Sequence, residues 1–193
     1  SDAQNNTAVG YASLSAASVG SNNTAIGTGA LASNTAASNT AVGYNALLTT
    51  TTATQVTALG YKAGEDSTGS SNTFIGYLAG AENSTGNQNC FIGASTAESG
   101  VCTGHSNTAV GGNNFTGITS GSLNTVMGVH AMRSFQTGEG NVAIGYNAKR
   151  LHSAGDDAVV IGNHAAYNMT TGRTVVVGNE AFYTGTSTDD SVF

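Results

Sequence analysis

The sequence predicts an all-β fold in which one short unit winds repeatedly into a parallel solenoid. First, the string Asn6-Thr-Ala-Val-Gly10 recurs with small changes along the whole chain. Second, 27 of the 193 residues are glycine, none is proline and only 8% are charged, a composition that suits uninterrupted ladders of strands. Third, the motif alternates residue types with the period of two that is typical of a strand.

The composition also excludes several classes of protein. Large apolar residues are too few to fill a thick, rounded core, so we do not expect an enzyme. A net charge of −6 is too small for a typical disordered chain of this length. Five basic residues against 11 acidic ones argue against nucleic acid as a partner. No apolar run approaches the ~18 residues that a membrane span needs, so we expect no direct insertion into a membrane.

The last glycine of the motif marks each repeat and is called the anchor below. Successive anchors are 16 to 18 residues apart, which predicts about eleven coils with a rise of ~4.8 Å each. The anchors are Gly10, Gly27, Gly43, Gly60, Gly76, Gly93, Gly111, Gly128, Gly145, Gly162 and Gly178. We therefore expect residues 1–193 to form a single β-roll repeat domain. The ending Ser191-Val192-Phe193 fits the opening of a twelfth repeat, so we expect a fragment cut from a longer protein.

Equivalent positions of the repeats form columns. The position before the anchor, the aliphatic column, holds only aliphatic residues or Met from Val9 to Val177, and we expect it to be buried. Two residues earlier is the Thr column, in which Thr or Val dominates and which shares a face with the aliphatic column. Between them is the Ala column, exemplified by Ala8, Ala25 and Ala41, which we expect on the opposite face together with the anchors.

The residues that follow the anchor predict the other side of the coil. Ala is common three residues after the anchor, and a large residue often follows it. This large column includes Leu14, Leu31, Leu47, Phe115, Met132 and Phe182. We expect it to form a second short strand across a narrow core. An Asn column, from Asn6 to Asn141, opens most repeats and suits either local backbone hydrogen bonds or a stacked ladder.

Two other solenoids do not fit the sequence. A hexapeptide β-helix needs an aliphatic residue at every sixth position, but steps of six from Val42 reach Leu48 and then Thr54. The same steps from Val9 reach two serines. The calcium-binding nonapeptide repeat requires an array of G-G-x-G-x-D strings, and the chain has none.

The strings Asn141-Val-Ala-Ile-Gly145 and Asn6-Thr-Ala-Val-Gly10 resemble the head repeats of YadA-type trimeric autotransporter adhesins. Units such as the one from Asn39 to Leu47 are also similar to repeats of phage tail fibres and related bacterial fibre proteins. The resemblance covers nearly the whole chain. It implies a left-handed parallel β-roll, a homotrimer wound around a common axis, and an extracellular adhesive fibre on a bacterial surface or virion. The units here are longer than those common in that family, and the last ones lack the opening Asn.

The residues themselves also favour a trimer. A thin roll buries little apolar surface against the entropy cost of ordering its backbone. The face of the Ala column is where we expect two further chains to pack. Phe74 and Phe91 interrupt that face, so we expect local widening there or a knob into a neighbouring chain.

Candidate chemical groups are sparse. His105, His130, His152 and His164 are expected on the surface; His130 and His164 share a column but lie two coils, or ~9.6 Å, apart. Cys90 and Cys102 are open to three interpretations: free thiols, a disulfide, or a metal site with His105.

The remaining short motifs indicate no reaction. The pairs Asp156-Asp157 and Asp189-Asp190 are expected to be solvated rather than paired for catalysis. Gly27-Thr-Gly29 and Gly138-Glu-Gly140 are interpreted as turns. We predict no catalytic, cofactor-binding or metal-binding residue.

Two features suggest a surface for a ligand. A Tyr column follows the anchor at Tyr11, Tyr44, Tyr61, Tyr77 and Tyr146. It is interpreted either as a structural ladder or as a row of stacking platforms for a glycan. The less regular stretch 95–135 is the second feature, because irregularity on a solenoid can mark a binding face.

These observations predict a non-enzymatic, trimeric fibre or adhesin head that mediates or supports attachment to a target cell. Its partner would be a glycan or protein receptor on that cell. One alternative is a passive shaft of a phage tail fibre with no ligand of its own. Another is an ice-binding β-solenoid, suggested by the Thr column. A polysaccharide-cleaving fibre would need converging carboxylates, and the 11 acidic residues are scattered.

Overall fold

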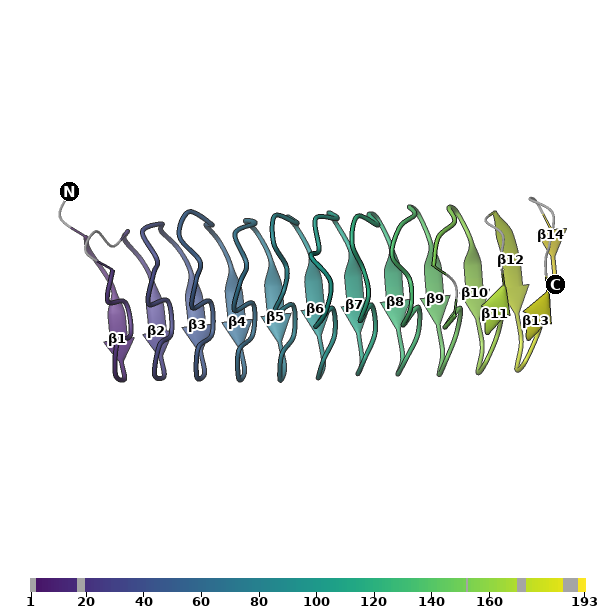
Figure 1. The fold of residues 1–193 in the computed structure, drawn as a ribbon, viewed down its shortest axis with the longest axis horizontal. Coiled ribbons are helices and arrows are strands. Elements are labelled where there is room, and N and C mark those ends of the chain that lie inside the picture. The colour runs from purple at the N-terminus through teal and green to yellow at the C-terminus, as the bar shows by residue number, and fades with distance from the viewer. Residues whose placement is uncertain (1–2, 17–19, 152, 170–172, 186–190) are drawn as a thin grey trace.

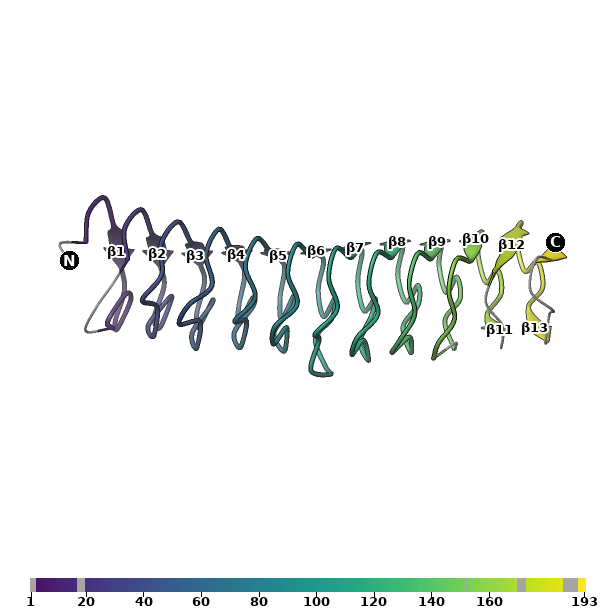
Figure 2. The same cartoon turned by 90° about the horizontal axis from the view of Figure 1, so that it is seen from above.

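A computed structural model describes residues 3–16, 20–151, 153–169, 173–185 and 191–193. The chain winds into a rod with a 12-stranded parallel sheet along one side (Figures 1 and 2). A separate two-stranded sheet, formed by β11 and β13, lies near the C-terminal end. No described residue is helical. The strands are β1 (Thr7–Val9), β2 (Thr24–Ile26), β3 (Thr40–Val42), β4 (Thr57–Leu59), β5 (Thr73–Ile75), β6 (Cys90–Ile92), β7 (Thr108–Val110), β8 (Thr125–Met127), β9 (Val142–Ile144), β10 (Val159–Ile161), β11 (Asn168–Met169), β12 (Thr174–Val177), β13 (Thr184–Gly185) and β14 (Ser191–Val192).

Each strand of the large sheet pairs with the equivalent strand of the next coil. Thr7 lies opposite Thr24, and Thr24 lies opposite Thr40. The same register continues to β10, where Ile161 lies opposite Val177. The expected all-β parallel solenoid is therefore confirmed, and so is the alignment of the repeats into columns.

The inside and outside of the sheet are the reverse of the sequence-based expectation. The Ala column faces the interior, where Ala25, Ala41 and Ala58 are completely buried. The aliphatic column faces outward, and Met127 and Val177 are 50% and 55% exposed. The prediction that the aliphatic column is buried was wrong, because the interior of so short a coil has room for small side chains on the sheet side. The Ala column is consequently not a face on which other chains could pack.

Phe74 and Phe91 belong to the same core and project into no neighbour. Both are fully buried and their rings lie 5.9 Å apart. Space for Phe74 comes from two glycines at large-column positions. A Cβ at Gly80 would lie 2.3 Å from Phe74 Cδ1, and one at Gly64 would lie 2.5 Å from Cδ2. Large residues on one wall are thus matched by small ones on the other, which corrects the expected widening of the rod.

The large column is buried as expected but does not form a second strand. Leu31, Leu47 and Phe115 are completely buried on the wall opposite the Ala column. Their backbones are in left-handed turns, with φ of 51°, 53° and 53°. The chain reverses direction here within a few residues, so the strand geometry that we expected is replaced by tight turns.

The anchor glycines allow successive coils to approach closely. Gly43 has a φ of 142°, and a Cβ there would lie 2.2 Å from the carbonyl oxygen of Gly60 in the next coil. The small residue at this position therefore serves contact between coils of one chain.

The Asn column forms a buried ladder through the rod. Asn23 Oδ1 accepts a hydrogen bond from the backbone N–H of Asn39 at 2.9 Å, and Asn39 Oδ1 accepts one from the N–H of Val56 at 3.0 Å. The Asn39 amide nitrogen also donates to the carbonyl oxygen of Ala53 at 2.8 Å. Each amide thereby satisfies backbone groups that the turns leave unpaired, which confirms the ladder alternative.

Candidate binding surfaces

The reactive residue types gather into no catalytic or metal centre in the described part of the chain. No three His, Cys, Asp or Glu side chains there lie close enough to hold a metal ion. Cys90 and Cys102 are free, as in the first of the three interpretations. Burial raises the pKa of the Cys102 thiol to about 11 and also raises that of Cys90, so both are weakly reactive at neutral pH.

The remaining candidates lie at or near the surface. Asp156 and Asp157 are exposed, as expected, and so is His105, whereas His130 and His164 are partly exposed. His152, Asp189 and Asp190 lie outside the described residues. The described part of the chain contains no helix that could cross a membrane.

The first continuous surface is the outward face of the large sheet. It carries the Thr column and the aliphatic column side by side along the rod, and the two columns are held in register by the strand pairing. No residue of this face in β1–β10 is charged. An uncharged, half-exposed aliphatic stripe of this length is unusual for a surface that faces only water.

The second surface is the edge on which the chain leaves the sheet and turns. Tyr44, Tyr61 and Tyr77 stack there at centroid separations of 5.4 and 5.2 Å, with ring planes within 11° of parallel. This confirms the structural ladder, although the rings remain about half exposed. Tyr11 is not part of the stack and is 82% exposed, because the next coil has Thr28 in the Tyr column.

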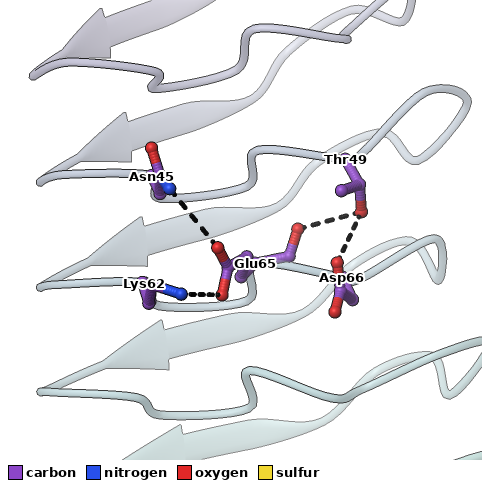
Figure 3. A network of polar contacts seen from close by, with 5 residues as sticks. All are labelled: Asn45, Thr49, Lys62, Glu65 and Asp66. Carbon is purple, nitrogen blue, oxygen red and sulfur yellow. Dashed lines mark hydrogen bonds and ion pairs between the residues drawn. The ribbon is translucent and has the colours of Figure 1, made fainter.

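The lysine beside this Tyr stack is paired with a carboxylate of the same coil (Figure 3). Lys62 Nζ lies 3.0 Å from Glu65 Oε2, and Asn45 donates to Glu65 Oε1 at 3.4 Å. The Thr49 hydroxyl lies 3.0 Å from both the Glu65 carbonyl oxygen and Asp66 Oδ1. The hydrogen bond to Glu65, followed by its negative charge, raises the pKa of Lys62. The cation therefore has a partner within the protein.

The same edge has a different character further along the rod. Here His130, Arg133, Tyr146, Arg150, His164 and Tyr167 form what we call the basic–aromatic patch. The ring of Tyr146 lies 6.1 Å from that of His130 and 5.3 Å from that of His164. The two histidines that share a column are thus separated by a tyrosine.

Arg150 is fixed within this patch by Tyr167. Its Nη1 donates to the Tyr167 hydroxyl at 2.6 Å, and its Cζ lies 5.6 Å from the centre of that ring. Tyr167 stacks in turn on Tyr183, with centroids 4.9 Å apart and planes 3° from parallel. The less regular stretch 95–135 includes Arg133, but sequence analysis missed Arg150 and Tyr167. They occupy the same column, five residues after the anchor, in which residue types change from coil to coil.

Lys149 is a further residue that sequence analysis missed. It occupies a large-column position, is completely buried, and donates to Asn141 Oδ1 at 2.6 Å. Its Nζ lies 5.2 Å from the centre of the Phe135 ring. Loss of hydration lowers the pKa of Lys149 to about 7, while the charge of Asp156 acts in the opposite direction. The signal in the sequence was a lysine in a column of hydrophobic residues.

The less regular stretch 95–135 contributes mainly to the core. Phe115 and Phe135 are buried and continue the row of rings that begins at Phe74. The coil after β6, which contains the 18-residue spacing, projects beyond its neighbours (Figure 2). Most of the irregularity therefore reflects larger core residues and one longer loop.

Comparisons with protein-family models, curated proteins and solved structures found no match for this chain.

Proposed function

We propose that this chain is part of a non-enzymatic, trimeric fibre or adhesin head that mediates or supports attachment to a target cell surface. In this proposal the solenoid is a left-handed β-roll, and three copies lie around a common axis. The fibre is extracellular and meets a glycan or protein receptor of the target cell. The resemblance of the repeats to YadA-type heads and phage fibres supports the proposal.

The observation that carries the proposal is the uncharged outward face of the large sheet. Thr73 and Ile75 of β5 illustrate its two columns, which continue from coil to coil without a charged residue in β1–β10. Burial of the aliphatic column between chains would remove apolar surface from water along the whole rod. The contact between chains is therefore assigned to this face and no longer to the Ala column, which is inside the roll.

The test is the mass in solution of the chain and of one variant of this face. We expect light scattering during gel filtration to give three chains of 19.1 kDa each for the unmodified protein. Ile92→Asp places a charge on the proposed contact, and its outward direction leaves the core of the roll intact. The variant is expected to elute as a folded monomer with an unchanged β-type circular dichroism spectrum.

A matched control carries the same charge elsewhere. Thr85 is exposed in a turn away from the sheet, so Thr85→Asp is expected to remain trimeric. A folded monomer for the unmodified chain would overturn the trimer. Attachment to cells is then measured with labelled protein, and the passive shaft is the conclusion if the trimer attaches to none.

A second candidate function is ice binding, favoured by the Thr column that runs in register along the outward face. The accessible surface of the single chain is 7897 Å², close to the ~8,400 Å² expected for a compact protein of this mass, so a monomer is also reasonable. Thermal hysteresis of freezing by a monomer, lost on substitution of Thr57 and Thr73 by Asp, would establish this function. If no thermal hysteresis is detected, ice binding is excluded and the fibre remains the proposed function.

A further inference from the structure

The basic–aromatic patch is a local concentration of positive charge on an acidic chain. The net charge is −6 and there are only five Lys and Arg residues, yet Arg133 and Arg150 lie in equivalent positions of neighbouring coils. Neither forms an ion pair with a described carboxylate, in contrast to Lys62. The positive field is felt by His130, whose pKa is lowered first by burial and then by Arg133 and Arg150.

The patch also contains unpaired polar atoms beneath its surface. Among the described residues, the buried side-chain atoms that lack a protein hydrogen-bond partner are Asn147 Oδ1, Arg150 Nε and His164 Nδ1. His164 Nε2 lies 2.9 Å from Asn147 Nδ2. The unmatched groups are thus an amide oxygen, a guanidinium N–H and one ring nitrogen of histidine.

These groups define the chemistry of a suitable ligand. The guanidinium of Arg150 carries a positive charge that no described carboxylate neutralises, and an anionic oxygen forms the charge-assisted hydrogen bonds that a guanidinium favours. The guanidinium of Arg150 is already held by Tyr167, so little side-chain freedom is lost on binding. The half-exposed ring of Tyr146, 5.3 Å from that of His164, offers an apolar surface in the same patch. A planar cation and an open ring in one patch match a sugar ring that carries a carboxylate.

We propose that the basic–aromatic patch is the binding site for an acidic saccharide, whose carboxylate is held by Arg133 and Arg150 while its ring stacks on Tyr146. This inference rests on the attachment function proposed above and names its ligand class. Glu180, one coil beyond His164, marks the C-terminal limit of the positive area.

The test is binding of the whole chain to an array of carboxylated, sulfated and neutral glycans. We expect the bound glycans to be acidic, and binding to weaken as the salt concentration rises. The double variant Arg133→Gln/Arg150→Gln is expected to reduce binding at least tenfold. Arg133→Lys/Arg150→Lys keeps the charge but not the planar guanidinium, and it is expected to retain part of the binding that the Gln variant loses.

The matched control disrupts the Tyr stack of Tyr44, Tyr61 and Tyr77, which lies on the same edge of the rod. Tyr44→Ser/Tyr61→Ser leaves the patch intact and is expected to bind acidic glycans as the unmodified chain does. Circular dichroism and thermal melts of all variants verify that the roll is folded. Binding only to neutral glycans, no binding by the folded chain, or equal binding by the Gln variant would overturn the inference.

Attachment to cells separates this inference from the proposed function. If the Gln variant and the unmodified chain attach equally well to cells, the attachment function stands and the assigned site is wrong. If neither attaches while the array still shows Arg-dependent binding to acidic glycans, the site stands and the attachment function fails.

Discussion

The edge of the rod carries two aromatic stretches that differ in how completely their polar groups are paired. Around Tyr61 the rings are parallel at coil spacing, and Lys62 is neutralised by Glu65. Around Tyr146 the rings are tilted among histidines, and Arg150 has an unpaired buried Nε. The backbone scaffold is the same in both. The comparison teaches that regular columns pair their own polar groups, whereas the less regular stretch leaves buried polar atoms without a partner in the protein.

The largest predicted effect concerns the buried lysine beneath the second stretch. Lys149→Met should stabilise the protein at pH 7 or below by up to about 4–5 kcal/mol, because the pKa falls from 10.5 to about 7 on folding. Between these two values the unfolded chain binds more protons than the folded one. The stability of the unmodified protein should therefore rise as the pH increases from 7 to 10.5.

Denaturant unfolding across pH 6–10.5 checks this prediction. The Met variant keeps the shape of the side chain and removes its titration, so its stability should lack this rise. Parallel pH profiles for the two proteins would contradict the lowered pKa.

The next effect concerns the core beneath the first stretch. Phe74→Ala should destabilise the roll by about 3–5 kcal/mol, because its ring fills the space left by Gly64 and Gly80. Gly80→Ala alone should also destabilise, since its Cβ would overlap the ring. In the double variant the two changes should partly compensate, which a double-mutant cycle of unfolding free energies would measure. Strict additivity would show that the two walls do not pack together.

The sequence was sufficient to predict the columns but not to predict which column faces the interior of the coil. Recurrence of Asn6 to Gly10 correctly predicted parallel strands in register. Both faces of each strand carry apolar residues, however. The alternation of residue types with a period of two therefore does not show whether Ala41 or Val42 lies inside the coil. That depends on the width of the coil, which the left-handed turns at the large column determine.

The candidate site was predictable only in part. A shared column linked His130 to His164, but nothing local in the sequence placed Arg150 against Tyr167. The unpaired atoms of the patch depend on side-chain directions within three coils. A charged residue in a hydrophobic column, such as Lys149, was the one visible signal that this end of the rod differs from the other.

A smaller effect is predicted for the Tyr stack itself. Tyr61→Ser breaks two ring contacts, each worth about 0.5–1.5 kcal/mol beyond area burial, so the unfolding free energy should fall by about 1–3 kcal/mol. Tyr11→Ser, which disrupts no stack, is the matched control and should change the free energy far less. Equal effects of the two substitutions would mean that the ladder contributes no stability. In that case the contrast between the two stretches would lie only in how their charged groups are paired, with Lys62 matched by Glu65 and Arg150 matched by no described carboxylate.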